Sequence, residues 1–451
     1  MGLFQQPAKA AGLQHGGGGT VKVTAAGTRA LPPGVPACYN AARRGPGRGE
    51  ASPQTLLRPA FLSGGSVTNW MFWVFAAVDF VAWSVRALQF RRYAGTALRL
   101  DAAPADGPEP LPRLSVVVPA RNEEATVEEA MRTLLAADYP EVEVVAVDDR
   151  STDATGAILD RLAAAHPRLR VAHVGELPPG WLGKNHALHL GAGLASGEYI
   201  LFTDADVHFE PSALRRAVRA ARRRGVDHLV LLPEMVLEGF WETLGVSYFA
   251  AMFLFRFLPW RVSDADSAAY VGVGAFNLVR AAAYRRAGGH AGLPMDVLDD
   301  VKLGKRLKAS GARQECGWSG GLVRVRWAVG LRGIVEGLSK NAYAGLGFRP
   351  AAVAWTFAAA FLLAVWPAVG LWVGPPGARL LCAGALLGMV GMAGALRPGL
   401  SGSALYGLAF PLAAPIFCYA ILRSMVCTYR HGGVVWRGTL YPLADLRKGV
   451  V

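Results

Sequence analysis

The chain has 451 residues, of which 52% are hydrophobic, with a mean hydropathy of +0.28 and a formal net charge of +14. That length can hold two or three domain-sized units, and the hydropathy is high for a soluble protein. Much of the positive charge lies beside apolar segments, as in the cytoplasmic loops of membrane proteins, so no nucleic-acid partner is expected. The five cysteines include no C-x-x-C pair, which argues against a zinc site and a disulfide framework.

Residues 1–60 are rich in Gly, Ala, Pro and Arg and show no apolar period. This composition predicts a disordered tail. The segment has neither the apolar core nor the small-residue cleavage site of a secretory signal. Met71 is the next methionine, and whether translation starts there instead stays open.

Apolar segments flank the middle of the chain. Residues 67–85 form a 19-residue run with one charge, Asp79, which is about the length that crosses a bilayer. Arg86 and its neighbours follow at once and favour the cytoplasmic side. About three further spans are expected over 351–422, before a basic tail over 423–451. Three crossings after a cytoplasmic domain would leave that tail outside, against its charge. A re-entrant segment and a tail that folds back both stay open.

Residues 112–348 alternate short apolar runs with helical patterns, which predicts an α/β domain with a doubly wound, mostly parallel sheet, inserted between transmembrane helices. The expected strands cover 114–118, stopped by Pro119, then 142–147, 169–174, a run from Tyr199, and 227–232. The expected helices cover 122–136, 152–165, 184–195 and 211–224. The aromatic segment 240–260 is interpreted as an interfacial helix because charged residues interrupt it; a core helix is the alternative.

Pairs of acidic residues follow the strands or begin helices: Glu123-Glu124, Asp148-Asp149, Asp204 with Asp206, and Asp299-Asp300. The carboxyl ends of strands in a doubly wound sheet meet at one crevice. Carboxylates there can accept hydrogen bonds from a base or ribose, hold a divalent cation with phosphate oxygens, and act as a general base. Crowded acids repel one another, so stability alone does not explain such a regular set.

These segments resemble the ordered motifs of family 2 glycosyltransferases with the GT-A fold. The match covers residues 112–348 and rests on Leu114-Ser-Val-Val-Val-Pro-Ala-Arg-Asn-Glu-Glu124, Val147-Asp-Asp-Arg-Ser-Thr-Asp153, Thr203-Asp-Ala-Asp206 and Leu298-Asp-Asp-Val-Lys-Leu303. Within the family the chain looks most like membrane-bound enzymes that glycosylate lipids, such as ceramide, hopanoid-associated and carotenoid glycosyltransferases. Trp181-Leu-Gly-Lys-Asn-His-Ala187, Gly274-Ala-Phe-Asn-Leu-Val-Arg280, Gly288-Gly-His290, Lys340-Asn341 and Trp436-Arg-Gly438 support that subgroup.

The resemblance implies a role for individual residues. A nucleotide-sugar donor would be bound by Ala120, Arg121, Glu123, Asp148, Asp149, Lys184 and Asp204. A divalent metal, Mg or Mn, would be held by Asp204 and Asp206. Asp300 would be the catalytic base, beside Asp299, where the family often has Glu. A lipid or isoprenoid acceptor would meet Gly274, Phe276, Asn277, Arg326 and Trp327.

Plainer interpretations stay open for three of these positions. Lys184 is also compatible with a surface lysine at a helix start, and Asp299-Asp300 with acids that stabilise a helix dipole. Trp327 is equally compatible with a core tryptophan. Processive polysaccharide synthases of the family often carry Gln-x-x-Arg-Trp, and Val323 stands here in place of the Gln.

The expected activity is that of an inverting, metal-dependent hexosyltransferase in the cell membrane, a multi-pass protein with its catalytic domain in the cytoplasm. A processive polysaccharide synthase and a non-catalytic membrane scaffold with a degenerate transferase domain are the alternatives. Neither the donor sugar nor the acceptor follows from the sequence.

Overall fold

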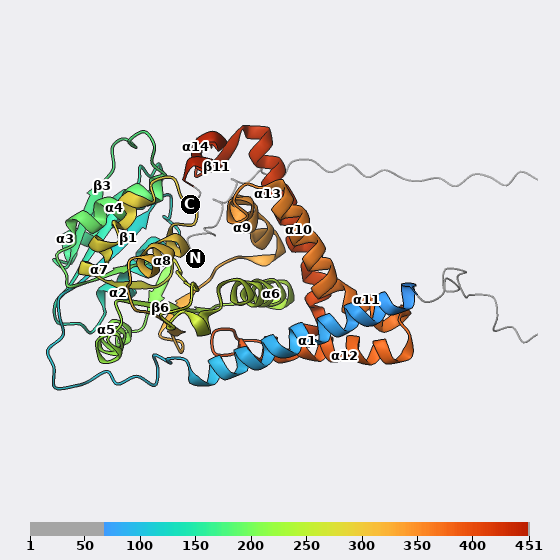
Figure 1. Ribbon diagram of the computed structural model, residues 1–451. Helices are drawn as coiled ribbons and strands as arrows, with labels where there is room; N and C mark the ends of the chain where they lie inside the picture. Colours follow the sequence, from blue (N-terminus) through green and yellow to red (C-terminus); the bar gives the residue numbers. More distant parts are fainter. Residues whose placement is uncertain (1–66, 450–451) are drawn as a thin grey trace, which may run out of the picture. The chain divides into compact units, whose positions relative to one another are not determined.

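The computed structural model describes residues 67–449, so the tail expected over 1–60 lies outside the described residues. A seven-stranded sheet forms the centre of the domain, in the strand order β3-β2-β1-β4-β8-β6-β9 (Figure 1). Only β8 runs against the others, because it pairs antiparallel with both β4 and β6. The strands are β1 (Leu114–Ala120), β2 (Val142–Asp148), β3 (Leu169–His173), β4 (Tyr199–Phe202), β6 (His228–Leu232), β8 (Asn277–Arg280) and β9 (Gln314–Trp318). The expected mixed α/β fold with a mostly parallel sheet is therefore confirmed.

Helices cover both faces of the sheet, as the strand composition requires. Val116 and Val118 of β1 pack in one core with Met131 of α2, whereas Val117 packs in another with Leu188 of α4. Successive strand residues point to opposite faces, so a strand covered on both sides is apolar throughout. The first face carries α2 (Val127–Leu135), α3 (Thr155–Ala165) and α5 (Ala213–Arg224), and the second α4 (Gly183–Leu194), α7 (Ala281–Arg286) and α8 (Asp299–Ala309).

Two expected boundaries were wrong. The first strand does not stop before Pro119 but continues to Ala120. Its pairing with β4 has already ended at Val117, on the side where the missing proline N–H would point, so the strand loses no hydrogen bond. The next helix begins at Val127 instead of residue 122, because Asn122 has a left-handed backbone with φ 53°. Glu123 therefore lies in a loop at the sheet edge.

A small second sheet follows the Asp204–Asp206 segment. It has the order β5-β10-β7, formed by β5 (Val207–Phe209), β7 (Glu234–Met235) and β10 (Val323–Val325). Short 3₁₀ turns lie at Pro259–Arg261 and Gly289–Gly292, and α9 (Gly330–Gly345) leads towards the C-terminal apolar helices.

Within residues 67–449, five apolar helices have the length and composition to cross a membrane. They are α1 (Val67–Thr96), α6 (Gly239–Phe257), α10 (Pro350–Ala360) continued by a π-helical turn (Phe361–Val365) and α11 (Trp366–Val373), α12 (Pro376–Ala395), and α13 (Phe410–His431), preceded by a 3₁₀ turn (Ala404–Ala409). Helix α6 is the one that was not among the four spans expected from the sequence. Its most apolar window is 56% buried, against 17–39% for the others. The interfacial assignment of α6 stays a prediction.

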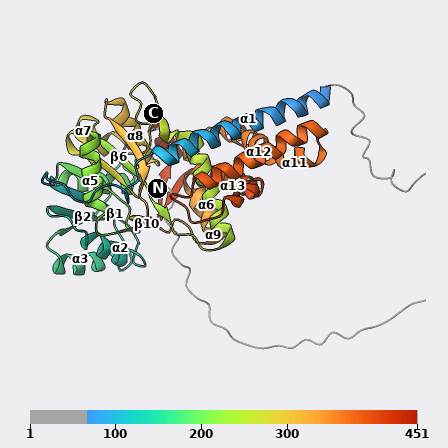
Figure 2. The same ribbon diagram turned by 90° about the horizontal axis from the view of Figure 1, so that it is seen from below.

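The apolar helices α1 and α12 lie side by side, as both ribbon views show (Figures 1 and 2). Glycines of α12 make this approach possible, because a Cβ at Gly377 or Gly384 would come within 2.6 Å of Trp73 or Phe80 of α1. Small residues that let helix backbones approach closely are typical of packing between membrane helices.

The C-terminal segment is folded. Helix α13 continues to His431, and the hairpin of β11 (Gly433–Trp436) and β12 (Thr439–Pro442) follows, with α14 (Leu443–Lys448) after it. One part of the predicted basic tail thus extends a helix, and the remainder folds back onto the α/β domain.

Candidate active site

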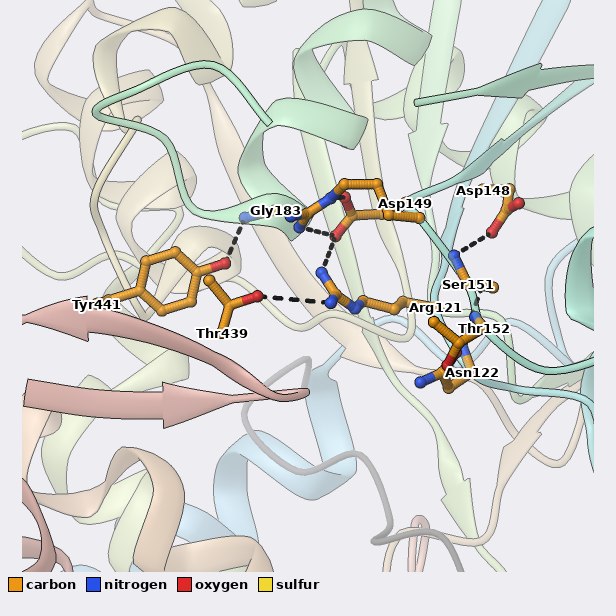
Figure 3. A network of polar contacts seen from close by, with 10 residues as sticks. Arg121, Asn122, Asp148, Asp149, Ser151, Thr152, Gly183, Thr439 and Tyr441 are labelled. Atoms are coloured by element: carbon orange, nitrogen blue, oxygen red, sulfur yellow. Dashed lines mark hydrogen bonds and ion pairs between the residues drawn. The ribbon is translucent and has the colours of Figure 1, made fainter. Parts of the chain in front are cut away.

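The ends of β1 and β2 hold a buried carboxylate between two arginines. Asp149 accepts hydrogen bonds from Arg150 Nε at 2.8 Å and Nη2 at 3.3 Å, and from Arg121 Nη1 at 3.4 Å (Figure 3). Arg150 has φ 58°, a left-handed backbone that non-glycine residues rarely adopt and that is frequent at functional sites. The neighbouring Asp148 instead accepts the Ser151 N–H at 3.1 Å.

Asp148 and Asp149 therefore face different surroundings. Asp148 Oδ2 lies 3.0 Å from His173 Nδ1, and hydrogen bonds to Asp160 and Asp148 raise the pKa of this histidine. Asp149 faces Gly183, where a Cβ would lie 2.1 Å from its Oδ2. Of the two, Asp149 is the one that lines a pocket.

That pocket is small, with a cavity volume of about 30 Å³, and it is partly open to solvent. It brings together four residues predicted for the donor, Ala120, Arg121, Asp149 and Lys184. Its opposite wall was not predicted as part of the site: it is formed by Trp436, Arg437 and Tyr441. The Trp436-Arg-Gly438 motif was noted only as a mark of a subgroup, although an arginine and two aromatic residues so close together suit an anionic ligand.

Lys184 joins two of the predicted acidic motifs. Its Nζ lies 2.8 Å from Asp204 Oδ1 and 3.5 Å from Asp299 Oδ2. All three side chains are at most 9% exposed. The charges of Asp204, Asp299 and Asp300 keep the pKa of Lys184 raised against the opposing effect of its burial. The interpretation of Lys184 as a surface lysine does not fit this position.

Gly274 connects the end of β4 to the start of α8. Its carbonyl accepts the Asp204 N–H at 3.1 Å, and its own N–H donates to Asp300 Oδ2 at 2.9 Å. The Val301 N–H donates to Asp300 Oδ1 at 2.8 Å. The downstream pair Asp299-Asp300 is thereby held beside Asp204, as the convergence of strand ends predicted.

The two residues of this pair differ in their surroundings. Both oxygens of Asp300 accept backbone hydrogen bonds, which stabilise the charged carboxylate. Asp299 Oδ1 has no hydrogen-bond partner within the described range 67–449. Burial raises the pKa of Asp299, and the charges of Asp300 and Asp204 add to that effect while Lys184 opposes it.

The acids around Asp206 suit a cation that arrives with a phosphorylated ligand. Partial burial and the charges of Asp204 and Glu123 raise the pKa of Asp206, so negative charge there is poorly compensated. Over residues 67–449 no group of three or more His, Cys, Asp or Glu side chains forms a complete metal site. Mg²⁺ in phosphate-binding sites commonly has one or two carboxylate ligands and takes further oxygens from substrate and water. Asp204 and Asp206 fit that donor set.

Glu123 is the third acid beside these two, and it forms an ion pair with Arg437 Nη2. Burial raises the pKa of Glu123 against the effect of Arg437. Lys340 of α9 belongs to the same group of charges as Glu123 and Arg437. Its pKa is lowered to about 8, first by burial and then by the charge of Arg437. Lys340 was also absent from the predicted site residues.

Most residues predicted for the acceptor lie apart from the pocket at the ends of β1 and β2. Phe276 is fully buried in the core, and the Asn277 amide oxygen lies 3.1 Å from His228 Nε2, inside the sheet. Arg326 pairs with Glu238 at 2.5 Å, and Trp327 stacks on Phe249 of α6 with ring centroids 4.7 Å apart. Gly274, by contrast, contacts Asp204 and Asp300.

A second cavity lies where α6, α8, α9 and α13 meet. It has a volume of about 420 Å³ and is lined mainly by apolar side chains, among them Phe249, Phe253, Leu338 and Phe417. Helix α8 contributes one face at i, i+3, i+4 and i+7: Leu298, Val301, Lys302 and Lys305. Leu298 and Val301 directly flank Asp299 and Asp300, so this cavity adjoins the acidic pair.

Comparison with known proteins gives a consistent family. Residues 115–281 match the model for glycosyl transferase family 2. Beta-monoglucosyldiacylglycerol synthase from Synechocystis sp. is 37% identical over 134 residues, 27% of this chain and 28% of the relative. The 4,4'-diaponeurosporenoate glycosyltransferase from Staphylococcus aureus is 25% identical over 252 residues, 54% of this chain and 66% of the relative. The chain thus spans about a quarter of the length of the first curated relatives that it matches.

Solved structures give weaker likenesses. The mannosyltransferase PcManGT from Pyrobaculum calidifontis, in complex with GDP-Man and Mn²⁺, covers 79% of this chain and 98% of its own. Its sequence identity is 19% and the TM-score is 0.43. The fold assignment rests on the sheet of the chain itself.

Proposed function

We propose that this chain, whose residues 115–281 form a family 2 glycosyltransferase domain, transfers a sugar from a nucleotide-sugar donor to a lipid or isoprenoid acceptor in a membrane. The observation that carries the proposal is the position of Asp299-Asp300 at the start of α8. On one side, Asp299 lies 3.5 Å from Lys184, a residue of the donor pocket. On the other, the flanking Leu298 and Val301 line the apolar cavity. A hydroxyl group at the end of an apolar molecule would thus meet the donor at this pair.

On the donor side, Asp149 accepts hydrogen bonds from the base or ribose, and Arg121 and Lys184 face the diphosphate. Asp204 and Asp206 would hold a divalent ion, Mg or Mn, which would supply positive charge beside the diphosphate. Lys184 stabilises the same charge from the protein side, and its pairing with Asp204 and Asp299 fixes its position in advance.

On the acceptor side, Asp300 removes the proton of the acceptor hydroxyl while the oxygen attacks the anomeric carbon. The bond from that carbon to the donor phosphate breaks, and the nucleoside diphosphate leaves. One displacement inverts the configuration, so an α-linked donor gives a β-glycoside. Asp299 acts by positioning Lys184.

We place the protein in the cell membrane as a multi-pass protein, with its catalytic domain in the cytoplasm. The hairpin after α13 contacts the catalytic domain through Tyr441 and Gly183. Both ends of the segment from Pro350 to His431 therefore lie on one side, which requires an even number of crossings between them. Of its three apolar segments, at least one enters the membrane without crossing it. This arrangement would reconcile the basic tail with the positive-inside rule.

The experiment is mass spectrometry of lipid extracts from cells with and without the gene, and with Asp300→Asn, Asp299→Asn or Asp160→Asn. Asp160 is a matched control, 60% exposed on α3. We expect a lipid heavier by one hexose with the wild type and the control, and a loss of about 100-fold or more for Asp300→Asn, the effect of removing a general base. A polymeric saccharide would indicate a processive synthase instead. Full activity of Asp300→Asn with loss in Asp299→Asn would move the base to Asp299, and unchanged lipids throughout would refute the proposal.

A further inference from the structure

The hairpin β11–β12 closes the donor pocket from the side opposite the sheet. The Tyr441 hydroxyl accepts the Gly183 N–H at 3.1 Å, and Thr439 Oγ1 accepts a hydrogen bond from Arg121 Nη2 at 3.4 Å (Figure 3). Arg437 pairs with Glu123 through Nη2 and donates from Nη1 to the Asn122 carbonyl at 2.9 Å. One hairpin thus binds two elements of the pocket, the loop after β1 and the start of α4.

Apolar packing fixes the hairpin in this position. Val434, Trp436 and Tyr441 belong to one buried cluster with Leu182, the residue before α4, and Tyr343 of α9. Each of the three hairpin residues is at most 8% exposed. A hairpin of four-residue strands is marginal in isolation, so its position depends on this cluster.

The turn of the hairpin has an unusual residue at its tip. Arg437 and Gly438 connect Trp436 to Thr439 with φ values of 47° and 79°. Two-residue turns with positive φ at both positions favour Asn-Gly, Asp-Gly or Gly-Gly, because a longer L side chain is strained there. The backbone conformation therefore does not explain why an arginine occupies this turn position. The contacts of its side chain explain it, because the side chain is only 11% exposed and pairs with Glu123, which is itself 10% exposed.

Arg437 lies where the charged diphosphate of a donor would bind. Its partner Glu123 is close enough to Asp204 and Asp206 for their charges to interact. Arg437 thus lies at the border between the pocket and the predicted metal ligands, which is where the diphosphate of a donor joins the two. A guanidinium can bind carboxylate and phosphate oxygens through separate N–H groups, so it can keep Glu123 while it gains a phosphate.

We infer that the C-terminal hairpin is part of the donor site, and that Arg437 binds the diphosphate of the nucleoside diphosphate sugar. The inference rests on the proposed function, since it takes the pocket as the donor site.

Nucleotide binding to the purified full chain in detergent tests it. Calorimetry with UDP, GDP, dTDP and CDP, each with Mn²⁺, identifies the nucleotide that the wild type binds best. The variant is Arg437→Asn, which gives the turn its favoured Asn-Gly sequence and removes the cation. Arg430→Asn is the matched control, because Arg430 is exposed in the last turn of α13. We expect at least tenfold weaker binding for Arg437→Asn, wild-type affinity for Arg430→Asn, and partial affinity for Arg437→Lys. Arg437→Asn also leaves the buried Glu123 uncompensated, so the double variant Glu123→Gln/Arg437→Asn, which removes that charge, should still bind at least tenfold more weakly than the wild type.

Two results would overturn the inference while the proposed function stands: wild-type affinity of Arg437→Asn, and restored affinity in Glu123→Gln/Arg437→Asn, which would show that Arg437 only neutralises Glu123. A wild type that binds none of the four nucleotides would instead remove the proposed function itself.

Discussion

Replacement of Lys184 by methionine removes the cation between two acidic motifs while it keeps a side chain of similar length. At an effective dielectric constant of about 20, the gross Coulomb attraction is about 6 kcal/mol to Asp204 at 2.8 Å and about 5 kcal/mol to Asp299 at 3.5 Å. The cost of burying these charges cancels much of it. Removing one partner of a buried pair still costs about 3–5 kcal/mol, because the acids stay buried and uncompensated.

In a chain of this size about 1 kcal/mol corresponds to about 2 °C, so Lys184→Met should lower the thermal midpoint by about 6–10 °C. The 12 tryptophans provide an intrinsic fluorescence signal for unfolding in detergent. Lys448→Met is the control, since Lys448 is 78% exposed and its ion pair with Asp445 is a surface pair. Its midpoint should stay within about 1 °C of the wild type, as for most surface pairs.

Mn²⁺ makes the test specific for the acidic site. In Lys184→Met a divalent ion has lost its competitor for Asp204, so Mn²⁺ should raise the midpoint of this variant more than that of the wild type. The reasoning is refuted by a midpoint within 2 °C of the wild type without metal. Equal stabilisation of both proteins by Mn²⁺ would refute the assignment of Asp204 as a metal ligand.

Three further outcomes are expected. Gly183→Ala should weaken nucleotide binding at least tenfold, because its Cβ would lie 2.1 Å from Asp149 Oδ2, whereas Gly193→Ala, with nothing within 4 Å, should leave calorimetric affinity unchanged. Gly345→Phe should fill the apolar cavity and raise the KM for the lipid acceptor severalfold without changing that for the donor; equal effects on both would contradict the assigned cavity. Burial alone would raise the pKa of Glu143, but serine, backbone and arginine donors lower it to about 2. Glu143→Gln should therefore cost about 1.5–3 kcal/mol above pH 5, and its midpoint difference from the wild type should disappear as pH falls from about 4.5 towards 2; a constant difference would contradict this.

The sheet was largely predictable because its strands are buried on both faces and read as continuous apolar runs. The acidic residues at strand ends were predictable for a related reason, since parallel strands bring their carboxyl ends together. Asp204, Asp299 and Lys184 meet as this rule requires. The helix predicted from residue 122 was wrong because local acid content favours a helix start, whereas a left-handed residue sets the loop.

The remaining parts of the site depend on distant contacts. Arg437 and Glu123 are separated by 314 residues, and no local pattern connects them. The apolar cavity is assembled from four helices, each of which has an ordinary amphipathic or apolar sequence. Phe276 and Asn277 belong to a motif that looked like an acceptor site, but the structure places both in the core of the sheet domain.

The contact between the hairpin and the sheet also bears on how the protein matures. A ribosome makes the strands of the donor pocket early, then the apolar helices, and the pocket's outer wall at Trp436, Arg437 and Tyr441 only after them. The wall can reach the pocket only once α13 has its final place against α9, since the Tyr343 N–H donates to Ser424 Oγ of α13 at 3.1 Å. The pocket is therefore complete only in a chain whose apolar helices have already packed, so under the proposed function donor binding would be tied to correct membrane assembly.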